Sequence, residues 1–182
     1  PVGAGHITND LAIGLKTSVM VAEAVKLDHA QALSEGISKR DEVDLHKYSE
    51  EEKKGSFVYK RDIALISEAR MTEIFEAVNE ELKKIGRAGK LPAGVILTGG
   101  GSKLPMIIDL AKQVFELPVF HGLPINQDFP IDKLNDPEYT TALGLVIWAD
   151  RNIESGYTLP GADVFKKMGS KINNVFKSIW PS

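Results

Sequence analysis

The chain has 182 residues, of which 43% are apolar, and its 25 acidic and 22 basic residues give a net charge of -3. This composition supports a hydrophobic core and excludes a disordered chain, and the acidic balance excludes a nucleic-acid binder held by phosphate contacts. Cysteine is absent, which excludes disulfides and cysteine-bound metals, and no apolar run or leader pattern predicts a spanning helix or a signal peptide. Because the sequence opens with Pro1 rather than Met, we expect it to be part of a longer protein.

Two short helices are predicted near the start of the chain. Three consecutive residues of N-cap type (8–10) precede residues 11–16, which predicts a short helix there. A second helix is predicted over residues 18–32. It places Glu23 and Lys26 on one face, where an exposed ion pair is the ordinary interpretation and a functional pair is the alternative.

A hairpin and a long helix are predicted next. Alternating and β-branched residues over 41–46 and 56–67 predict two strands with one wet face, joined by a charged, solvated loop. Ser67 is the predicted N-cap of a long helix that ends at Gly86. Its apolar residues recur at helical spacing and form one stripe: Met71, Ile74, Phe75, Val78, Leu82 and Ile85.

An apolar strand predicted over residues 94–98 leads directly into three glycines and a serine (99–102). The helix predicted after this turn spans residues 104–115, with Pro105 in its first turn. Backbone N–H groups and a helix N-terminus would then meet at one spot, which stabilises phosphates and sugar hydroxyls. The spacing is neither that of a Walker A loop nor that of a dinucleotide-binding turn, so a tight turn requiring left-handed backbone angles is an equal alternative.

A strand predicted over residues 118–121 and a helix over 137–149 complete an order of elements that indicates an α/β fold class. The four histidines lack the spacing of metal ligands, and no serine or carboxylate stands beside a histidine in a nucleophile motif. We therefore expect no catalytic residue and no metal site in this chain.

The C-terminal residues form a separate, basic segment. Residues 151–162 have the Gly, Pro and Ser/Thr content of a linker, and residues 163–180 predict an amphipathic helix. Its apolar face includes Phe165, Met168, Ile172, Phe176, Ile179 and Trp180, and its lysines are Lys166, Lys167, Lys171 and Lys177. This composition is typical of helices that lie in a membrane interface, and docking on protein is the alternative.

Three segments together resemble the FtsA family of bacterial cell-division proteins, within the actin-like ATPases. They are residues 3–12 (GAGHITNDLA), 22–26 (AEAVK) and 94–105 (GVILTGGGSKLP). The resemblance implies the C-terminal half of an actin-like, ribonuclease H-like ATPase fold with an inserted α+β subdomain and a C-terminal amphipathic helix. The implied divisions are a nucleotide-binding subdomain over 1–27 and 93–150, an inserted FtsZ-binding subdomain over 28–92, the linker 151–162 and the membrane helix 163–180.

The resemblance also implies half of a site for ATP with Mg. Its residues in this chain would be Gly3, Glu23, Lys26, Gly99, Gly100, Gly101, Ser102 and Lys103. The glycine turn would hold the adenosine, Lys103 would lie on the adenine, and Glu23 and Lys26 would face the ribose and base from the opposite helix. Ala4 stands where the family often has glycine. The phosphate hairpins and metal ligands are expected upstream of Pro1, so we expect at most a weak ATPase in the full-length protein and no catalysis by this chain alone.

The implied partners are the FtsZ C-terminal tail, held by Arg70 and Glu73, further copies of the protein in actin-like filaments, and an anionic membrane contacted by the C-terminal helix. For Arg70 and Glu73, an ordinary solvated helix face is an equal alternative. The implied function is to tether the FtsZ ring to the cytoplasmic face of the cell membrane at the division site during septum formation. Other proteins of this superfold stay open as alternatives: a PilM-like ATPase of type IV pilus assembly, a sugar or acid kinase, or a chaperone ATPase.

Overall fold

A computed structural model describes residues 2–123 and 132–154 of the chain. The chain divides into two compact units, Pro1–Thr141 and Ala142–Ser182. Helix α5 (Thr140–Glu154) supplies the described part of the second unit and continues four residues into the predicted linker. The predicted membrane helix, residues 163–180, lies outside the described residues. Within the described ranges, no helix has the length and apolar content to cross a membrane.

The first unit opens with two helices, α1 (Gly5–Leu15) and α2 (Val19–His29). Ser18 caps α2, and its Oγ accepts a hydrogen bond from the Val21 backbone N–H at 3.2 Å. The prediction that residues 8–10 cap α1 is wrong, because α1 begins at Gly5 and these residues lie inside it. The side chains of Thr8 and Asp10 instead contact other helices.

A short antiparallel hairpin follows, made of β1 (Glu42–Asp44) and β2 (Phe57–Tyr59), with Val43 opposite Val58. A 3-10 turn, η1 (Leu45–Lys47), follows β1. The predicted second strand is wrong beyond Tyr59, because the chain turns there into a helix. Residues 60–67 contain apolar side chains that satisfy a period of two over a short window, yet their burial follows the helical period.

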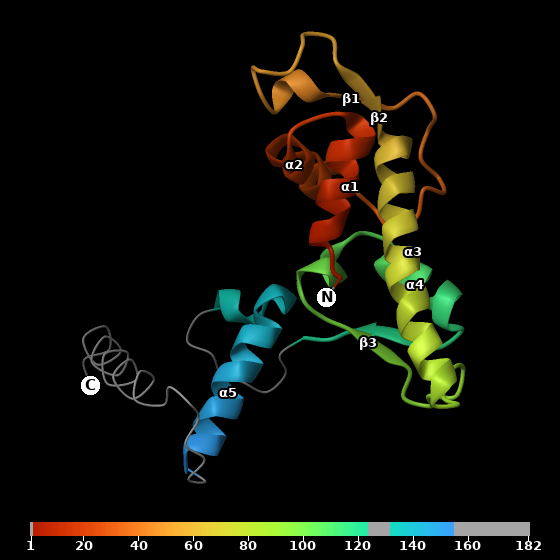
Figure 1. Cartoon of the computed structure of the whole chain (residues 1–182), viewed down its shortest axis with the longest axis vertical. Coiled ribbons are helices and arrows are strands. Elements are labelled where there is room, and N and C mark those ends of the chain that lie inside the picture. The colour runs from red at the N-terminus through yellow and green to blue at the C-terminus, as the bar shows by residue number, and fades with distance from the viewer. Residues whose placement is uncertain (1, 124–131, 155–182) are drawn as a thin grey trace, which may run out of the picture. The chain divides into compact units, whose positions relative to one another are not determined.

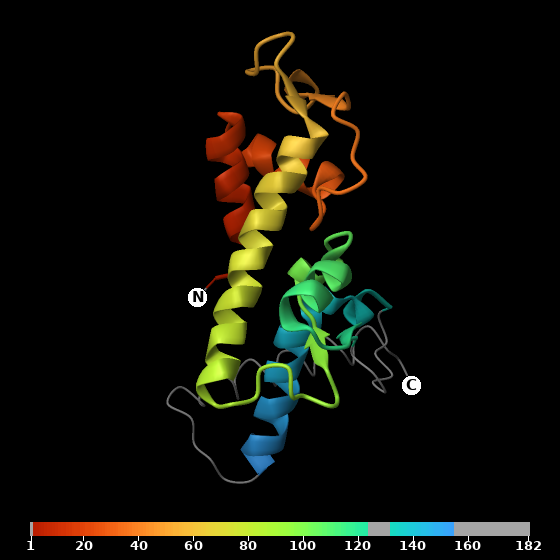
Figure 2. The same ribbon diagram turned by 90° about the vertical axis from the view of Figure 1, so that its right-hand side faces the viewer.

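Helix α3 (Lys60–Lys84) is the longest element among the described residues and lies alongside α1 in its first half and α4 in its second half (Figures 1 and 2). Ser67 does not cap it. This residue is fully buried two turns inside the helix, and its hydroxyl donates to the Ile63 carbonyl at 2.8 Å. The predicted apolar stripe is buried at Met71 and Phe75, whereas Val78 and Ile85 near the helix end are exposed.

The second half of the unit is a parallel pair of strands, β3 (Val95–Leu97) and β4 (Val119–His121), connected through α4 (Ile107–Phe115). Between β3 and α4 the glycine turn forms a 3-10 helix, η2 (Gly100–Lys103). The predicted helix start at residue 104 is wrong, since α4 begins at Ile107 and Pro105 precedes it. The Pro105 carbonyl instead accepts a hydrogen bond from the Ala32 backbone N–H at 2.8 Å.

Two further 3-10 turns, η3 (Asp132–Asn135) and η4 (Pro137–Tyr139), precede α5. The predicted helix over residues 137–149 is thus an α-helix only from Thr140 onward.

One hydrophobic core holds the first unit together. Ile7 and Leu11 of α1, Val25 of α2, Ile63 of α3 and Ile107 of α4 are each at most 2% exposed and belong to this cluster. Phe75 and Phe115 join α3 to α4, with ring centroids 5.3 Å apart. Helices packed with both antiparallel and parallel strand pairs confirm the predicted α/β class.

Candidate functional site

A cavity of about 460 Å³ lies between α2 and the glycine turn after β3. Five residues that the sequence analysis proposed for nucleotide contact line it: Glu23, Lys26, Gly100, Gly101 and Lys103. Its size falls in the range of small-molecule sites. The fold therefore brings together two segments far apart in the sequence and leaves an open volume between them.

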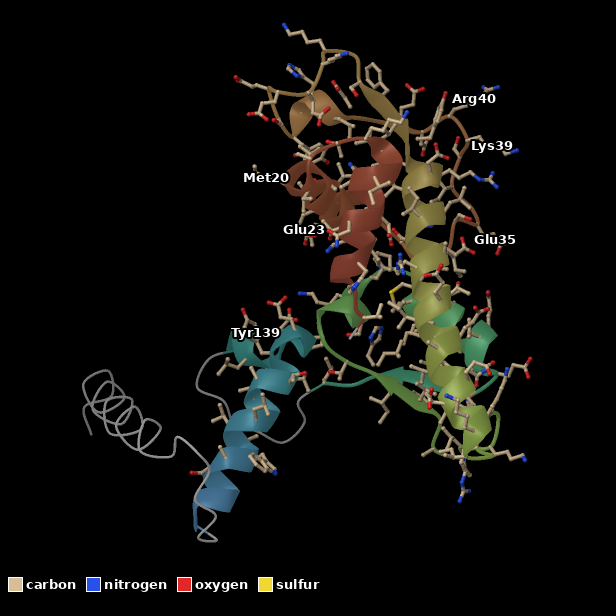
Figure 3. All side chains as sticks on the ribbon, in the orientation of Figure 1. Met20, Glu23, Glu35, Lys39, Arg40 and Tyr139 are labelled. Carbon is tan, nitrogen blue, oxygen red and sulfur yellow. The ribbon has the colours of Figure 1, made fainter. Side chains whose placement is uncertain are left out.

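The helical wall of the cavity carries an ion pair. Val21, Ala22 and Val25 of α2 are buried in the core, whereas Glu23 of the same helix, labelled in Figure 3, lines the cavity. The Lys26 Nζ lies 2.6 Å from Glu23 Oε2, and the Lys26 side chain is only 13% exposed, against 44% for Glu23. The pair is thus partly desolvated rather than an ordinary surface pair.

The environment of Glu23 favours its charged form. Burial alone would raise the pKa of this carboxyl group, but hydrogen bonds donated by Lys26 and Thr8, together with the Lys26 charge, outweigh burial and hold the pKa below its usual value. At neutral pH the wall therefore presents a carboxylate acceptor beside an ammonium donor. This combination can bind the hydroxyl groups of a sugar.

The opposite wall is the glycine turn, in which Gly99 adopts a left-handed conformation with φ of +83°. The Gly99 backbone N–H donates to the Pro137 carbonyl at 3.1 Å, and the Gly99 carbonyl accepts from the Ser102 hydroxyl at 2.8 Å. The expected α-helix N-terminus is not at this turn, because η2 has only four residues and α4 starts later. The turn instead lets a ligand approach its backbone closely, because its glycines have no side chains.

Ala4 and Gly101, which both line the cavity, lie close together. A Cβ placed on Gly101 would lie 3.2 Å from the Ala4 Cβ, a contact tighter than most real Cβ contacts. Because glycine has no side chain, position 101 leaves room for the methyl group of Ala4. The departure from glycine at position 4 is accommodated without closing the cavity.

Lys103 stands at the rim of the cavity within an acidic pair. Its Nζ lies 2.7 Å from Asp136 Oδ2 and 3.5 Å from Glu138 Oε2. The hydrogen bond to Asp136 is the main cause that raises the pKa of Lys103. Its ammonium group is thus directed to η4, and its aliphatic stem is the part suited to lie on a flat ring.

Three of the proposed nucleotide residues do not line this cavity. Gly3 and Ser102 line a neighbouring cavity of about 220 Å³, and the buried Ser102 hydroxyl is already bonded to Gly99. Gly99 precedes η2 and shapes the turn. The cavity also includes Ala4, Leu27 and Glu138, which the sequence analysis did not propose.

The model of the family "Cell division protein FtsA" matches residues 1–144. The chain belongs to the FtsA family. Among curated relatives, the cell division protein FtsA of Bacillus subtilis (strain 168) is 36% identical over 152 residues, or 84% of this chain and 33% of that protein. FtsA of Pseudomonas aeruginosa is 28% identical over 87% of this chain and 38% of its own length. FtsA of Escherichia coli (strain K12) is 27% identical over 98% and 43%. The chain therefore spans 33 to 43% of the length of these relatives.

Arg70, the residue proposed to hold FtsZ in this FtsA-family chain, forms ion pairs with two acidic residues of the chain itself. Its guanidinium group donates to both carboxylate oxygens of Asp10, at 2.5 and 2.8 Å, and to Glu73 at 2.8 Å. The hydrogen bonds from Arg70 lower the pKa of Asp10. Arg70 thus ties α3 to α1, and Glu73, whose side chain is 63% exposed, is its acceptor nearest the solvent.

The sequence analysis missed Thr8, which lies on α1 and contacts both charged residues of the cavity wall. The signal was present, since Thr8 is a polar residue one turn before the apolar Leu11, but it was assigned to a helix cap. In the described ranges, no group of three or more histidine, aspartate or glutamate residues is placed to hold a metal ion.

Proposed function

We propose that this chain is part of an actin-like ATPase that binds ATP, assembles into filaments at the membrane and tethers the FtsZ ring at the division site. Membership of the FtsA family supports the role in cell division. The cavity between α2 and the glycine turn carries the proposal of ATP binding, because it combines an ion pair suited to sugar hydroxyl groups with an accessible backbone.

In this proposal the chain binds the adenosine part of ATP. Glu23 and Lys26 bind the ribose hydroxyls, and Gly100 and Gly101 let the ligand approach the backbone closely. The phosphates and Mg are held by residues outside this chain. The test is isothermal titration of ATP, with GTP for comparison, into the whole protein that carries this chain. Saturable binding of ATP with weaker binding of GTP is expected, and no heat of ATP binding would overturn the proposal.

Membrane attachment is proposed for residues 163–180. Removing residues 163–182 is expected to release the whole protein from anionic vesicles, because the deletion removes the apolar residues of the predicted amphipathic helix and four lysines. Each lysine near an anionic leaflet contributes about 1 kcal/mol. The measurement is co-sedimentation with vesicles, in which added salt should weaken attachment of the intact protein without eliminating it. Equal sedimentation of the deleted protein would exclude this segment as the anchor.

Binding of the acidic FtsZ tail is proposed at Arg70. The tail would replace Glu73 as the solvent-side acceptor of the guanidinium group while Asp10 keeps it in place. Arg70→Glu is expected to weaken binding of an FtsZ tail peptide by at least about tenfold, since it reverses the charge. The measurement is fluorescence titration of the labelled peptide.

A matched control for this titration is Asp10→Asn. This change weakens the same contact between α1 and α3 but keeps Arg70, so it separates damage to packing from loss of the contact. We expect Asp10→Asn to retain most of the peptide binding. Equal binding by Arg70→Glu and the unchanged protein would remove Arg70 from the site.

A further inference from the structure

Thr8 is a buried polar residue next to the proposed ribose contacts. It lies in the middle of α1 and is 5% exposed. A buried hydroxyl group without a hydrogen-bond partner destabilises a fold, so the partners of the Thr8 hydroxyl group show what this residue does.

The hydroxyl of Thr8 joins the two charged residues of the cavity wall. Its Oγ1 donates a hydrogen bond to Glu23 Oε2 and accepts one from Lys26 Nζ at 2.9 Å. Lys26 Nζ also donates to the same Glu23 oxygen at 2.6 Å. Three side chains from two helices therefore form a closed triangle, which restricts the rotamers of all three.

This triangle leaves defined groups for a ligand. Both contacts to Glu23 use Oε2, so Oε1 is the oxygen that neither Thr8 nor Lys26 uses. Lys26 carries three donors, of which the triangle uses two. The triangle therefore leaves one oxygen of the Glu23 carboxylate and one Lys26 donor unused, on two side chains that Thr8 holds.

We propose that Thr8 is a positioning residue for sugar recognition, which holds Glu23 and Lys26 in the geometry that favours a ribose over a 2′-deoxyribose. This inference rests on the proposed function of the cavity. A ribose offers neighbouring 2′ and 3′ hydroxyl groups to a fixed carboxylate, whereas a 2′-deoxyribose offers one of them. A fixed pair distinguishes these sugars better than a mobile one, because a mobile pair can rearrange around either ligand.

The test uses the whole protein that carries this chain. Thr8→Val removes the hydroxyl and keeps the branched shape, and Thr8→Ser keeps the hydroxyl as the matched control. Affinities for ATP and 2′-deoxy-ATP are measured by isothermal titration. Thr8→Val is expected to lower ATP affinity by about tenfold, because Glu23 and Lys26 lose the hydrogen bonds that hold them in place, and to bring the ratio of the two affinities toward one. Thr8→Ser should keep the affinity within about twofold and retain the ratio.

A second measurement does not depend on nucleotide. The pKa of the Glu23 carboxyl group, followed by ¹³C NMR, should rise in Thr8→Val because a donor to the carboxylate is lost. Thr8→Ala, which also lacks the hydroxyl group and adds no bulk, must give the same rise in the pKa of Glu23. An unchanged Glu23 pKa in both variants would overturn the positioning role.

The two proposals fail in different ways. ATP binding by the unchanged protein, with equal affinity and equal sugar preference in Thr8→Val, would overturn the role of Thr8 alone. No ATP binding by the unchanged protein would overturn both.

Discussion

Replacing Gly100 by valine is expected to lower the affinity for ATP by about a hundredfold or more while the protein stays folded. A Cβ on Gly100 would lie 3.8 Å from the Glu138 Cβ, which is ordinary van der Waals contact, and Gly100 does not have a left-handed backbone. The first added carbon is therefore tolerated. The two further methyl groups would occupy space beside a cavity that Gly100 and Glu138 both line.

The control for this prediction is Gly100→Ala, which adds only the tolerated carbon. Its affinity should fall much less than that of Gly100→Val, and both proteins should unfold at nearly the temperature of the unchanged protein. The measurement is isothermal titration of ATP with a thermal unfolding curve for each variant. A folded Gly100→Val protein with unchanged ATP affinity would show that the ligand does not approach this turn.

Gly94→Ala is expected to have the largest effect on stability. Gly94 has φ of +76°, and a Cβ at this position would lie 2.2 Å from the Pro118 carbonyl oxygen. That oxygen accepts the Val95 backbone N–H at 2.8 Å, so it cannot move away without disturbing the pairing of β3 with β4. We expect a loss of about 3 kcal/mol or more in the free energy of unfolding, measured by urea denaturation.

Gly89→Ala provides a matched control for the steric part of this effect. Gly89 has a similar φ of +65°, but a Cβ there would meet nothing within 4 Å. Gly89→Ala should lower the free energy of unfolding only by the cost of placing an alanine in the left-handed conformation, about 1 to 2 kcal/mol. Equal losses in the two variants would mean that the contact with Pro118 does not constrain the strand pair.

The glycine turn and the pair on α2 were predictable from sequence because each depends on neighbouring residues. Three glycines after an apolar strand predict a turn with an accessible backbone, and a spacing of three residues places Glu23 and Lys26 on one helix face. The capping of α2 by Ser18 is equally local. The buried stripe at Met71 and Phe75 follows from helical periodicity.

Other features depended on residues distant in the sequence. The start of α1 was misplaced because Thr8 and Asp10 have the side chains of capping residues, and only their contacts with Lys26 and Arg70 show that they serve tertiary packing. The boundary between β2 and α3 was misplaced because a short window of alternating apolar residues fits both periods.

By itself, the sequence determined the local geometry of the two segments that form the cavity, since turn conformation and helix spacing arise from backbone restrictions within a few residues. Only the tertiary structure decided that these segments face each other, because their approach depends on the core shared by α1, α2 and α4. The same packing placed Arg70 against Asp10, sixty positions earlier in the chain. It also buried Thr8 beside Glu23 and Lys26. There its hydroxyl group is shielded from water and hydrogen-bonds to both charged side chains.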